Sequence, residues 1–374
     1  MQEVAIPRGL EDVVVTSSSI AFIDGRQGRL IYRGYDIRDL ARRSSFEETA
    51  YLLWYGRLPR PSELQELSRR LASLRTLPPQ VLRVLEALSP GASPMEALRT
   101  GVSALSSFEP EELKQPRNTI GGALRLTAVL PTLFTAYHRI RQGEPPVTPR
   151  EDLNHASNLL YMLTGRLPPL TDAHVLDVAL ILHADHELNA STFAARVTAS
   201  TLSDLYSAVT SAVGTLKGPL HGGANERVMD LLEEVGSPDR AESVVVGKLH
   251  RHEKIMGFGH RVYKVEDPRA TILREYARAL CKERGDLTPV EILGKVEEVV
   301  HREKGLYPNV DLYSGTCYRA LGVPKDLFTP LFAASRVAGW TAHVLEEYSD
   351  NRLIRPTAKY TGPTDLTYRP PEER

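Results

Sequence analysis

The sequence predicts an all-α protein. Three recurring observations support this: helix-capping residues, apolar residues at helical spacing, and a glycine where each spacing stops. Thr288-Pro289-Val290-Glu291 combines a cap, a proline in the first turn and a glutamate placed for a capping box, and Gly305 ends the run. Ser45 and Glu48 make a similar box before a segment that ends at Gly56. Helix after helix, punctuated by 26 prolines and 26 glycines, predicts a helical globule.

Two further helices follow from the same signals. Thr148-Pro149-Arg150-Glu151 repeats the Thr-Pro-x-Glu start, and Gly165 stops the run that follows. Apolar positions of that run keep helical spacing at Leu153, Ala156, Leu160 and Leu163. Ser62, with Gln65 three residues later, predicts another helix start. Its apolar face is Leu64, Leu67, Leu71 and Leu74.

A single β signal lies near the start of the chain. Ser19–Phe22 and Arg29–Tyr32 flank the turn-forming segment Asp24–Gly28, which predicts a hairpin. No repeat of fixed period is visible. The likeness between Leu53–Pro59 and Met162–Pro168 indicates two similar helix ends rather than a duplication.

Composition limits the classes of protein that are possible. At 374 residues the chain exceeds the size at which one core usually stops growing, so two domains are expected. Apolar residues at 42% and charged residues at 25% are typical of a soluble globular protein. The formal net charge of −1 gives no overall field for nucleic acid or an acidic membrane, so an anionic substrate must meet locally gathered arginines. The cysteines, Cys281 and Cys317, predict reduced thiols.

The expected location is the cytoplasm. The N-terminal segment Met1–Arg8 lacks a basic start followed by an apolar run, so no signal peptide is predicted. No uncharged apolar stretch reaches membrane-spanning length. We therefore expect neither a membrane nor a nucleic acid as partner.

Three separated patches each place one proton-handling side chain beside glycines. They are Leu220–Asn225 with His221, Gly257–Tyr263 with His260, and Asn309–Gly315 with Asp311. Two histidines and one carboxylate can perform acid–base chemistry without a metal. Glycine lets a backbone approach a ligand or take a turn that a Cβ would forbid.

Each of the three residues also has a purely structural interpretation. His221 precedes a helix expected to begin near Gly222-Gly223, and a helix N-terminus disfavours an added positive charge, so the imidazole should be neutral. A neutral imidazole can donate a hydrogen bond to a developing enolate oxygen. The alternative is a histidine that only caps the helix or packs against it. Asp311 lies in a loop or at a helix start, as a general base or an N-cap. The surroundings of His260 suit an anionic ligand, or form an ordinary solvated loop. Its basic neighbours are Lys254, Arg261, Lys264 and Arg269.

A fourth patch, His183–Glu187, raises the question of a metal site. In the predicted helical run, His183 and His186 are three residues apart and would share a helix face. Zinc motifs on helices place their histidines four residues apart around a glutamate, and the spacing here differs. Two alternatives to zinc are a pair of buried structural histidines and a histidine that reaches a small dicarboxylate.

Taken in order, these motifs resemble the citrate synthase family. The segments that carry the resemblance are Asp24–Tyr35, Phe46–Leu53, His183–Asn189, the three glycine-flanked patches and Leu353–Pro356. The resemblance implies an all-α fold in which a large helical domain, residues 1–218 and 322–374, and a smaller helical domain, residues 219–321, enclose a cleft. The chain lacks the extra N-terminal domain of longer, hexameric members, so it resembles the short, dimeric type.

The resemblance also implies a reaction, the condensation of acetyl-CoA with oxaloacetate. Asp311 would remove a methyl proton from acetyl-CoA. His221 would hydrogen-bond the thioester oxygen and stabilise the enol or enolate. His260 would polarise the oxaloacetate carbonyl and protonate the alkoxide, after which citryl-CoA would be hydrolysed. No metal and no permanently bound cofactor is implied, because coenzyme A enters as part of the substrate.

The remaining site residues follow from the same resemblance. The expected substrate-binding residues are His186, Arg269, Arg336 and Arg355, and three guanidinium groups suit two carboxylates because each binds in a bidentate manner. Arg355 resembles the arginine that the family lends to its partner's site, which implies a catalytic homodimer. The expected coenzyme A contacts are Ile255, Met256, Gly257, Phe258, Gly259 and Lys264.

Three other functions remain open on the sequence. A 2-methylcitrate synthase would use propionyl-CoA, and one added methylene discriminates by only a few kcal/mol. A zinc hydrolase would use His183 and His186. A non-catalytic helical scaffold would need none of the patches.

Overall fold

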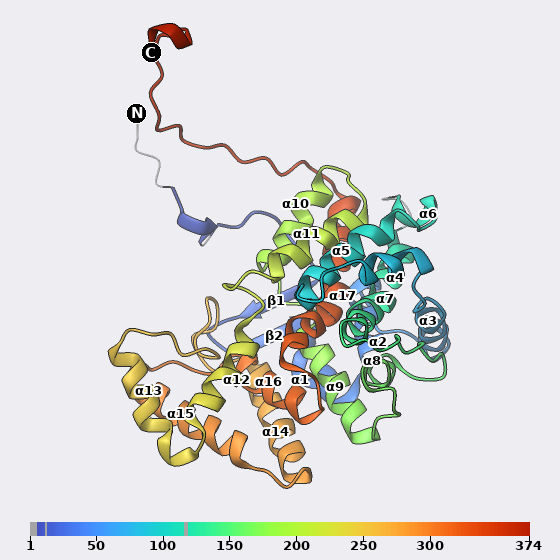
Figure 1. Ribbon diagram of the computed structural model, residues 1–374, viewed down its shortest axis with the longest axis vertical. Helices are drawn as coiled ribbons and strands as arrows, with labels where there is room; N and C mark the ends of the chain where they lie inside the picture. The colour runs from blue at the N-terminus through green and yellow to red at the C-terminus, as the bar shows by residue number, and fades with distance from the viewer. Residues whose placement is uncertain (1–5, 12, 116–118) are drawn as a thin grey trace.

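The structure is a computed structural model that describes residues 6–11, 13–115 and 119–374, and most of its regular structure is helical (Figure 1). The prediction of an all-α protein is confirmed. We predicted from Met1–Arg8 that there is no signal peptide. Residues 1–5 of that segment lie outside the described residues.

Two groups of helices form the body. The first group is α1 (Ile37–Arg43), α2 (Phe46–Tyr55), α3 (Pro61–Ser73), α4 (Pro79–Glu86), α5 (Pro94–Ser106), α6 (Glu111–Lys114), α7 (Thr119–Ile140), α8 (His155–Thr164), α9 (Leu170–His183), α10 (Ala190–Ser200), α11 (Leu205–Leu216) and α17 (Phe328–Ser349). The second is α12 (Ala224–Val235), α13 (Ala241–His250), α14 (Pro268–Glu283), α15 (Thr288–Lys304) and α16 (Val310–Ala320). Short 3₁₀ helices are η1 (Arg8–Leu10), η3 (Pro238–Arg240), η4 (Lys325–Leu327) and η5 (Pro371–Glu373).

Figure 1 shows α12 to α16 gathered at the lower left, beside the larger first group. Within the second group, α14 packs on α16 and α13 on α15, whereas α17 packs on α7, α10, α11, α2 and α9. Helices α1 and α9 meet α14 and α16 where the groups adjoin. The boundaries that we expect for two domains, at residues 219 and 321, follow this grouping and stay a prediction.

Helix α7 needs a separate comment because it is long and apolar enough to cross a membrane. Its segment Ile120–Ile140 passes that test by length and composition, but 89% of its most apolar window is buried. It packs against α17, α5 and α8. These contacts make α7 a core helix of the first group.

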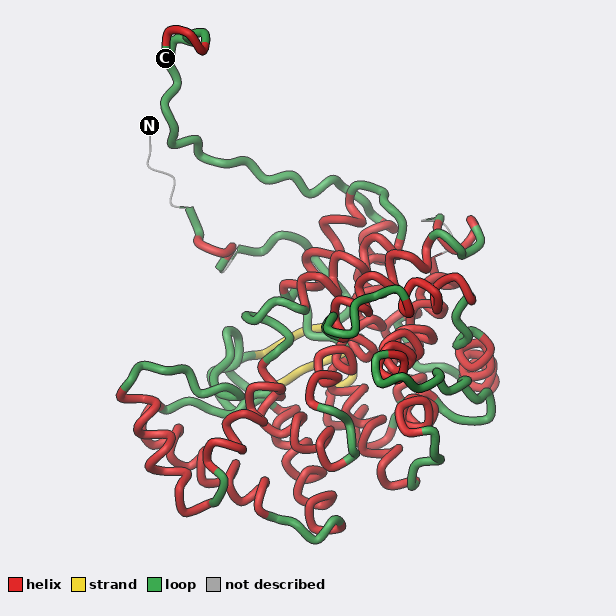
Figure 2. The backbone as a smooth tube through the Cα atoms, in the orientation of Figure 1, coloured by secondary structure: helices red, strands yellow, loops and turns green. Residues whose placement is uncertain are grey.

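The predicted hairpin is confirmed, with one strand more than expected and with its first strand two residues later than the predicted Ser19–Phe22. β1 (Ala21–Asp24), β2 (Arg29–Tyr32) and β3 (Tyr35–Asp36) form an antiparallel sheet, drawn in yellow in Figure 2. The first pair aligns Asp24 with Arg29. The Asp24 carboxylate accepts from the backbone N–H groups of Arg26 and Gln27 at 3.0 and 2.9 Å, which holds the turn closed. Gly28 completes the turn with φ of +61°.

Both boundaries of α2 and the C-terminal boundary of α15 are confirmed as predicted. Ser45 Oγ accepts from the Glu48 N–H at 3.2 Å, and Gly56 ends α2 with φ of +75°. Helix α15 runs to Lys304 with Gly305 as its C-cap at φ of +65°, as predicted. Its start differs, because Thr288 is the first helical residue and not the cap, and Leu287 precedes it without a side-chain cap.

Two further predicted helix starts are wrong. Thr148 does not cap a helix: α8 begins at His155, with Asn154 as its cap, and only its end at Gly165 is as predicted. Asn154 accepts from the Ser157 N–H at 2.8 Å, and the His155 N–H donates to the carboxylate of Glu47 at 2.8 Å, so a local cap and a distant residue together fix the start. Ser62 is not the cap of α3 either.

Helix α3 starts two residues earlier than its expected first turn. It begins at Pro61, and the Glu63 carboxylate accepts from the Arg60 N–H at 2.7 Å. The same carboxylate pairs with Arg57 at 2.6 Å. This ion pair fixes the start, and no spacing of apolar residues reveals it.

Candidate active site

Two buried arginines form the charged base of the site. Arg269, in the first turn of α14, pairs with Asp267 through two bonds of 3.0 and 2.7 Å, and Asp267 caps the same helix. Arg336 lies on α17 with 1% of its surface exposed, and its Nε donates to the His183 carbonyl at 2.6 Å. Burial lowers the pKa of Arg336 to about 10, which leaves the group charged at neutral pH.

The loop after α9 carries His186. Helix α9 ends at His183, so His186 lies beyond the helix, and our expectation that the two histidines share a helix face is wrong. The chain turns sharply here because Glu187 adopts φ of +53° and its N–H donates to Asp185 Oδ2 at 3.1 Å. No apolar spacing reports such a turn.

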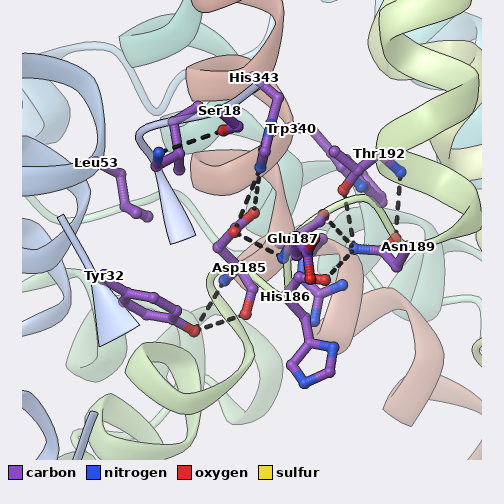
Figure 3. A network of polar contacts seen from close by, with 12 residues as sticks. Ser18, Tyr32, Leu53, Asp185, His186, Glu187, Asn189, Thr192, Trp340 and His343 are labelled. Carbon is purple, nitrogen blue, oxygen red and sulfur yellow. Dashed lines mark hydrogen bonds and ion pairs between the residues drawn. The ribbon is translucent and has the colours of Figure 1, made fainter. Parts of the chain in front are cut away.

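A buried polar network holds this loop in place (Figure 3). The Tyr32 hydroxyl donates to the Asp185 carbonyl at 2.7 Å, and His343 Nε2 lies 3.2 Å from the Asp185 carboxylate. Helix α17 approaches closely because Gly339 has no Cβ, which would lie 2.3 Å from the Ala184 carbonyl oxygen. The loop and Arg336 are therefore positioned by one helix.

His186 extends away from this network, as Figure 3 shows. Its ring centroid lies 5.0 Å from that of His260 and 5.7 Å from that of Tyr263. Among the described residues, its buried Nε2 has no hydrogen-bond partner. Burial, followed by the charges of Arg269 and His260, holds the pKa of His186 well below its usual range. A neutral ring with an unused polar atom is suited to a bound ligand.

The backbone around His260 fixes its tautomer. Nδ1 accepts from the N–H groups of Val262 and Tyr263 at 3.0 and 3.1 Å. Burial, followed by Arg269, lowers the pKa of His260 to about 4, so the ring is neutral near pH 7. A neutral ring whose Nδ1 accepts carries its proton on Nε2. His260 therefore presents an Nε2–H donor.

His221 has the opposite tautomer. Its Nε2 lies 3.3 Å from the Ser191 backbone N–H, which can only donate, and 2.8 Å from the Ser191 hydroxyl. Trp340 Nε1 donates to that hydroxyl at 3.0 Å and fixes it. Burial, followed by Arg336, lowers the pKa of His221 to about 4. The neutral ring accordingly carries its proton on Nδ1.

Asp311 lies in the first turn of α16 and is not the helix cap. Asn309 is the cap, and its side chain accepts from the Asp311 N–H at 3.0 Å. The Asp311 carboxylate makes no hydrogen bond or ion pair with the described part of the chain. Burial raises its pKa to about 6, although Arg269 and Arg336 act in the opposite direction. A partner-free carboxylate with a raised pKa can serve as a general base.

The three predicted catalytic residues belong to one site. The loop with His260 is tied to the start of α16, because Asn309 donates from its side chain to the Gly259 carbonyl at 3.0 Å and its N–H bonds to the Gly257 carbonyl at 2.9 Å. The charge of Arg336 acts on His221, His186 and Asp311 alike, and that of Arg269 acts on His260, His186 and Asp311.

A pocket of about 510 Å³ adjoins the site on the second group of helices. Four of the six expected coenzyme A contacts line it, namely Ile255, Met256, Gly257 and Phe258. Gly259 and Lys264 are not among its lining residues; Lys264 is exposed, and its backbone N–H donates to the Gly25 carbonyl at 2.8 Å. Lys254 and Lys304 add positive charge to the lining, and the second of these was missed because it ends a distant helix, α15.

Arg355, the fourth predicted substrate-binding residue, lies away from the two buried arginines. It is exposed, on the extended segment that leaves α17 and runs away from the body in Figure 2. The neighbouring Ile354 N–H donates to Ser200 Oγ at 3.1 Å, at the end of α10. Within the described residues, Arg355 makes no hydrogen bond or ion pair with the rest of the site.

Several supporting residues escaped the sequence analysis. Ser191 and Trp340 set the tautomer of His221, and Asp267 orients Arg269 while its second oxygen accepts from the Val310 N–H at 3.2 Å. Only Asp267 leaves a signal in the sequence, since it stands two residues before Arg269 and can cap the helix that carries it. No group of three or more residues able to hold a metal lies in residues 6–11, 13–115 and 119–374.

The chain is similar to known proteins along nearly its whole length. The family model described as "Citrate synthase, C-terminal domain" matches residues 9–357. A citrate synthase of Haloferax volcanii is 52% identical over 99% of this chain and 99% of its own, and a citrate/2-methylcitrate synthase of Bacillus subtilis is 43% identical over 95% and 96%.

A solved structure gives the same result. The citrate synthase of the archaeon Thermoplasma acidophilum, in a ternary complex with carboxymethyl coenzyme A and oxaloacetate, is 35% identical with a TM-score of 0.94, over 99% of this chain and 100% of that one. The sequence motifs, the fold and both comparisons lead to one conclusion: this chain belongs to the citrate synthase family.

Proposed function

We propose that this protein is a citrate synthase, which condenses acetyl-CoA with oxaloacetate and water to give citrate and CoA. One observation carries the proposal: two neutral histidines with opposite tautomers and a carboxylate with a raised pKa gather around two buried arginines. The names of its relatives support the same reaction.

Formation of the enolate comes first. A thioester methyl group is a weak acid, so the base needs help from a donor at the carbonyl oxygen. Asp311, with a pKa of about 6, is ionised at neutral pH and takes the methyl proton. The Nδ1–H of His221 donates to the thioester oxygen and stabilises the negative charge that develops there.

Bond formation to oxaloacetate follows. Oxaloacetate is held in a fixed orientation, because its two carboxylates bind Arg269, Arg336 and His186. The Nε2–H of His260 donates to the keto oxygen, which makes its carbon more electrophilic, and transfers its proton to the alkoxide that forms. The ring regains a proton from the water that enters for hydrolysis. Water then cleaves the thioester of citryl-CoA, releasing citrate and CoA.

The assay is release of CoA from acetyl-CoA plus oxaloacetate, with citrate identified by mass spectrometry. Absence of citrate would refute the proposal and favour a scaffold.

Propionyl-CoA in parallel tests the 2-methylcitrate synthase alternative, which the Bacillus subtilis relative supports by its name. We propose no metal, so dialysis against EDTA should leave the rate unchanged; a loss that zinc restores would favour the hydrolase.

We also propose that the protein works as a homodimer to which Arg355 contributes across the interface. Support comes from its exposed position on a segment that extends away from its own site. Two inactive proteins, Arg355→Ala and Asp311→Asn, would be mixed so that subunits exchange. If Arg355 acts across the interface, one cleft of a heterodimer receives both defects and the other none, so activity returns. No recovery, with exchange confirmed, would place Arg355 in its own cleft or outside catalysis.

A cytoplasmic location remains part of the proposal. It rests on the free, buried thiols of Cys281 and Cys317, which fit a reducing compartment. Cell fractionation followed by activity measurement tests it.

A further inference from the structure

The turn of the N-terminal hairpin lies directly against the loop that carries His260. The Lys264 N–H donates to the Gly25 carbonyl at 2.8 Å. A Cβ on Gly25 would lie 2.1 Å from the Val262 carbonyl oxygen, and one on Gly28 would lie 2.9 Å from Val265 Cγ2 and 3.0 Å from the Glu266 carbonyl oxygen. Two glycines of one turn therefore permit close contact with four residues of the loop, namely Val262, Lys264, Val265 and Glu266.

That stretch of loop is the one that orients the His260 ring. The N–H groups of Val262 and Tyr263 hold His260 Nδ1, and the Tyr263 ring packs on the His260 ring with centroids 4.7 Å apart. The carbonyl that faces Gly25 belongs to the same residue, Val262, whose N–H binds the imidazole. Movement of this residue changes the direction of the His260 Nε2–H.

The hairpin turn is itself rigid, so it can transmit position. Asp24 closes it with two bonds to backbone N–H groups, and Arg38, on α1, donates to the Gly28 carbonyl at 3.1 Å. The hairpin belongs to the first group of helices, whereas the loop lies between α13 and α14 of the second. The contact thus links the loop that carries His260 to the first group of helices, although the loop itself belongs to the second.

We propose that the hairpin turn, through Gly25 and Gly28, is a positioning element that sets the orientation of His260 for polarising the substrate carbonyl. The inference rests on the proposed role of His260 in the condensation. In this proposal both glycines act through the loop, Gly25 through Val262 and Gly28 through Val265 and Glu266.

The size of the perturbation follows from the contacts. Real Cβ atoms do not approach other atoms closer than 3.0 Å, so Gly25→Ala must separate the turn and the loop by at least 0.9 Å, from 2.1 Å. The atom in the way is a backbone oxygen, which cannot rotate aside. A displacement of this size at a catalytic group lowers kcat by about 10- to 100-fold.

The test measures kcat and, separately, the carbonyl stretching frequency of bound oxaloacetate by infrared difference spectroscopy. In the wild type, donation from His260 lowers that frequency relative to free oxaloacetate. We expect Gly25→Ala and Gly28→Ala to lose most of this shift and to lower kcat, while both still bind oxaloacetate through the arginines. The matched control is Gly34→Ala in the same sheet, where φ is +94° but no atom lies within 4 Å of the added Cβ, so it should keep the shift and kcat.

The outcomes separate this inference from the proposed function. If the wild type shows no shift, the role of His260 fails and the inference fails with it. If the wild type shows the shift and both variants retain it with unchanged kcat, only the positioning role is wrong. Should Gly25→Ala not fold, Gly28→Ala decides, because its contacts are milder: the Val265 methyl group at 2.9 Å can move, and the Glu266 carbonyl oxygen at 3.0 Å still presses on the loop backbone.

Discussion

Asp311→Asn should make the protein more stable while it removes catalysis. The Asp311 carboxylate is partly buried, without a hydrogen bond or ion pair to the described residues, and burial raises its pKa from 3.8 to about 6. Folding therefore favours the protonated form. Asparagine has nearly the same shape and no charge, so it removes the cost of holding an ionised carboxylate there.

The magnitude follows from the distance between the two pKa values. About two pH units separate them, and each unit corresponds to about 1.4 kcal/mol, which gives about 3 kcal/mol. Above pH 6 the folded protein carries the full cost, because the carboxylate is ionised in both states. Below pH 4 the carboxyl is protonated in both states and the difference disappears.

Urea unfolding of wild type and Asp311→Asn at pH 8 and pH 4, followed by tryptophan fluorescence, measures both limits. The matched control is Asp39→Asn, which removes an exposed carboxylate from the first turn of α1 and should cost about 0.3–1 kcal/mol. A loss of stability at pH 8 for Asp311→Asn, or a gain that persists at pH 4, would show that the carboxylate is not held at a cost in the folded protein.

Three other predictions follow from the site. Because Asp311 must be ionised and its pKa is about 6, kcat should be level above pH 6 and fall about tenfold per pH unit below it; a pH–rate profile that rises toward pH 5 would contradict this. Gly339→Ala places a Cβ 2.3 Å from the Ala184 carbonyl oxygen, which should displace the His186 loop and raise KM for oxaloacetate about tenfold (about 1.4 kcal/mol). The control variant Gly294→Ala, whose added Cβ meets open space, should leave KM unchanged. Equal KM values for the two variants would show that Gly339 does not position the loop. Ser191→Ala leaves Trp340 Nε1 unpaired, so the free energy of unfolding should fall by about 1–3 kcal/mol. It also removes the hydroxyl contact to His221, so kcat should fall. An unchanged kcat would mean that the Ser191 backbone N–H alone positions the His221 ring.

Elements defined by local chemistry could be predicted from the sequence. The hairpin around Asp24–Gly28 and the ends of α2 and α15 depend on residues within a few positions of one another, and all three are confirmed. The start of α8 has a local signal, the cap Asn154, which the prediction passed over in favour of Thr148. Its second support, the bond from the His155 N–H to Glu47, joins residues more than a hundred positions apart and leaves no local signal.

The same distinction applies to the site. The glycine-flanked patches marked His221, His260 and Asp311, but nothing local indicates that Ser191 faces His221 or that Trp340 supports it. The sequence left Asp311 open as a base or a cap. That choice depends on Asn309, two residues away, which takes the capping position and leaves the carboxylate free.

The most direct test of the account is exchange of the acetyl-CoA methyl hydrogens in D₂O. With malate, which lacks a keto group, in place of oxaloacetate, the enolate can form but cannot condense. Deuterium incorporation, followed by mass spectrometry, then reports proton removal alone. The account predicts exchange in the wild type, exchange in His260→Gln, and a loss of about 100-fold or more in Asp311→Asn. Exchange at the wild-type rate in Asp311→Asn would show that another group removes the proton and would contradict the central claim.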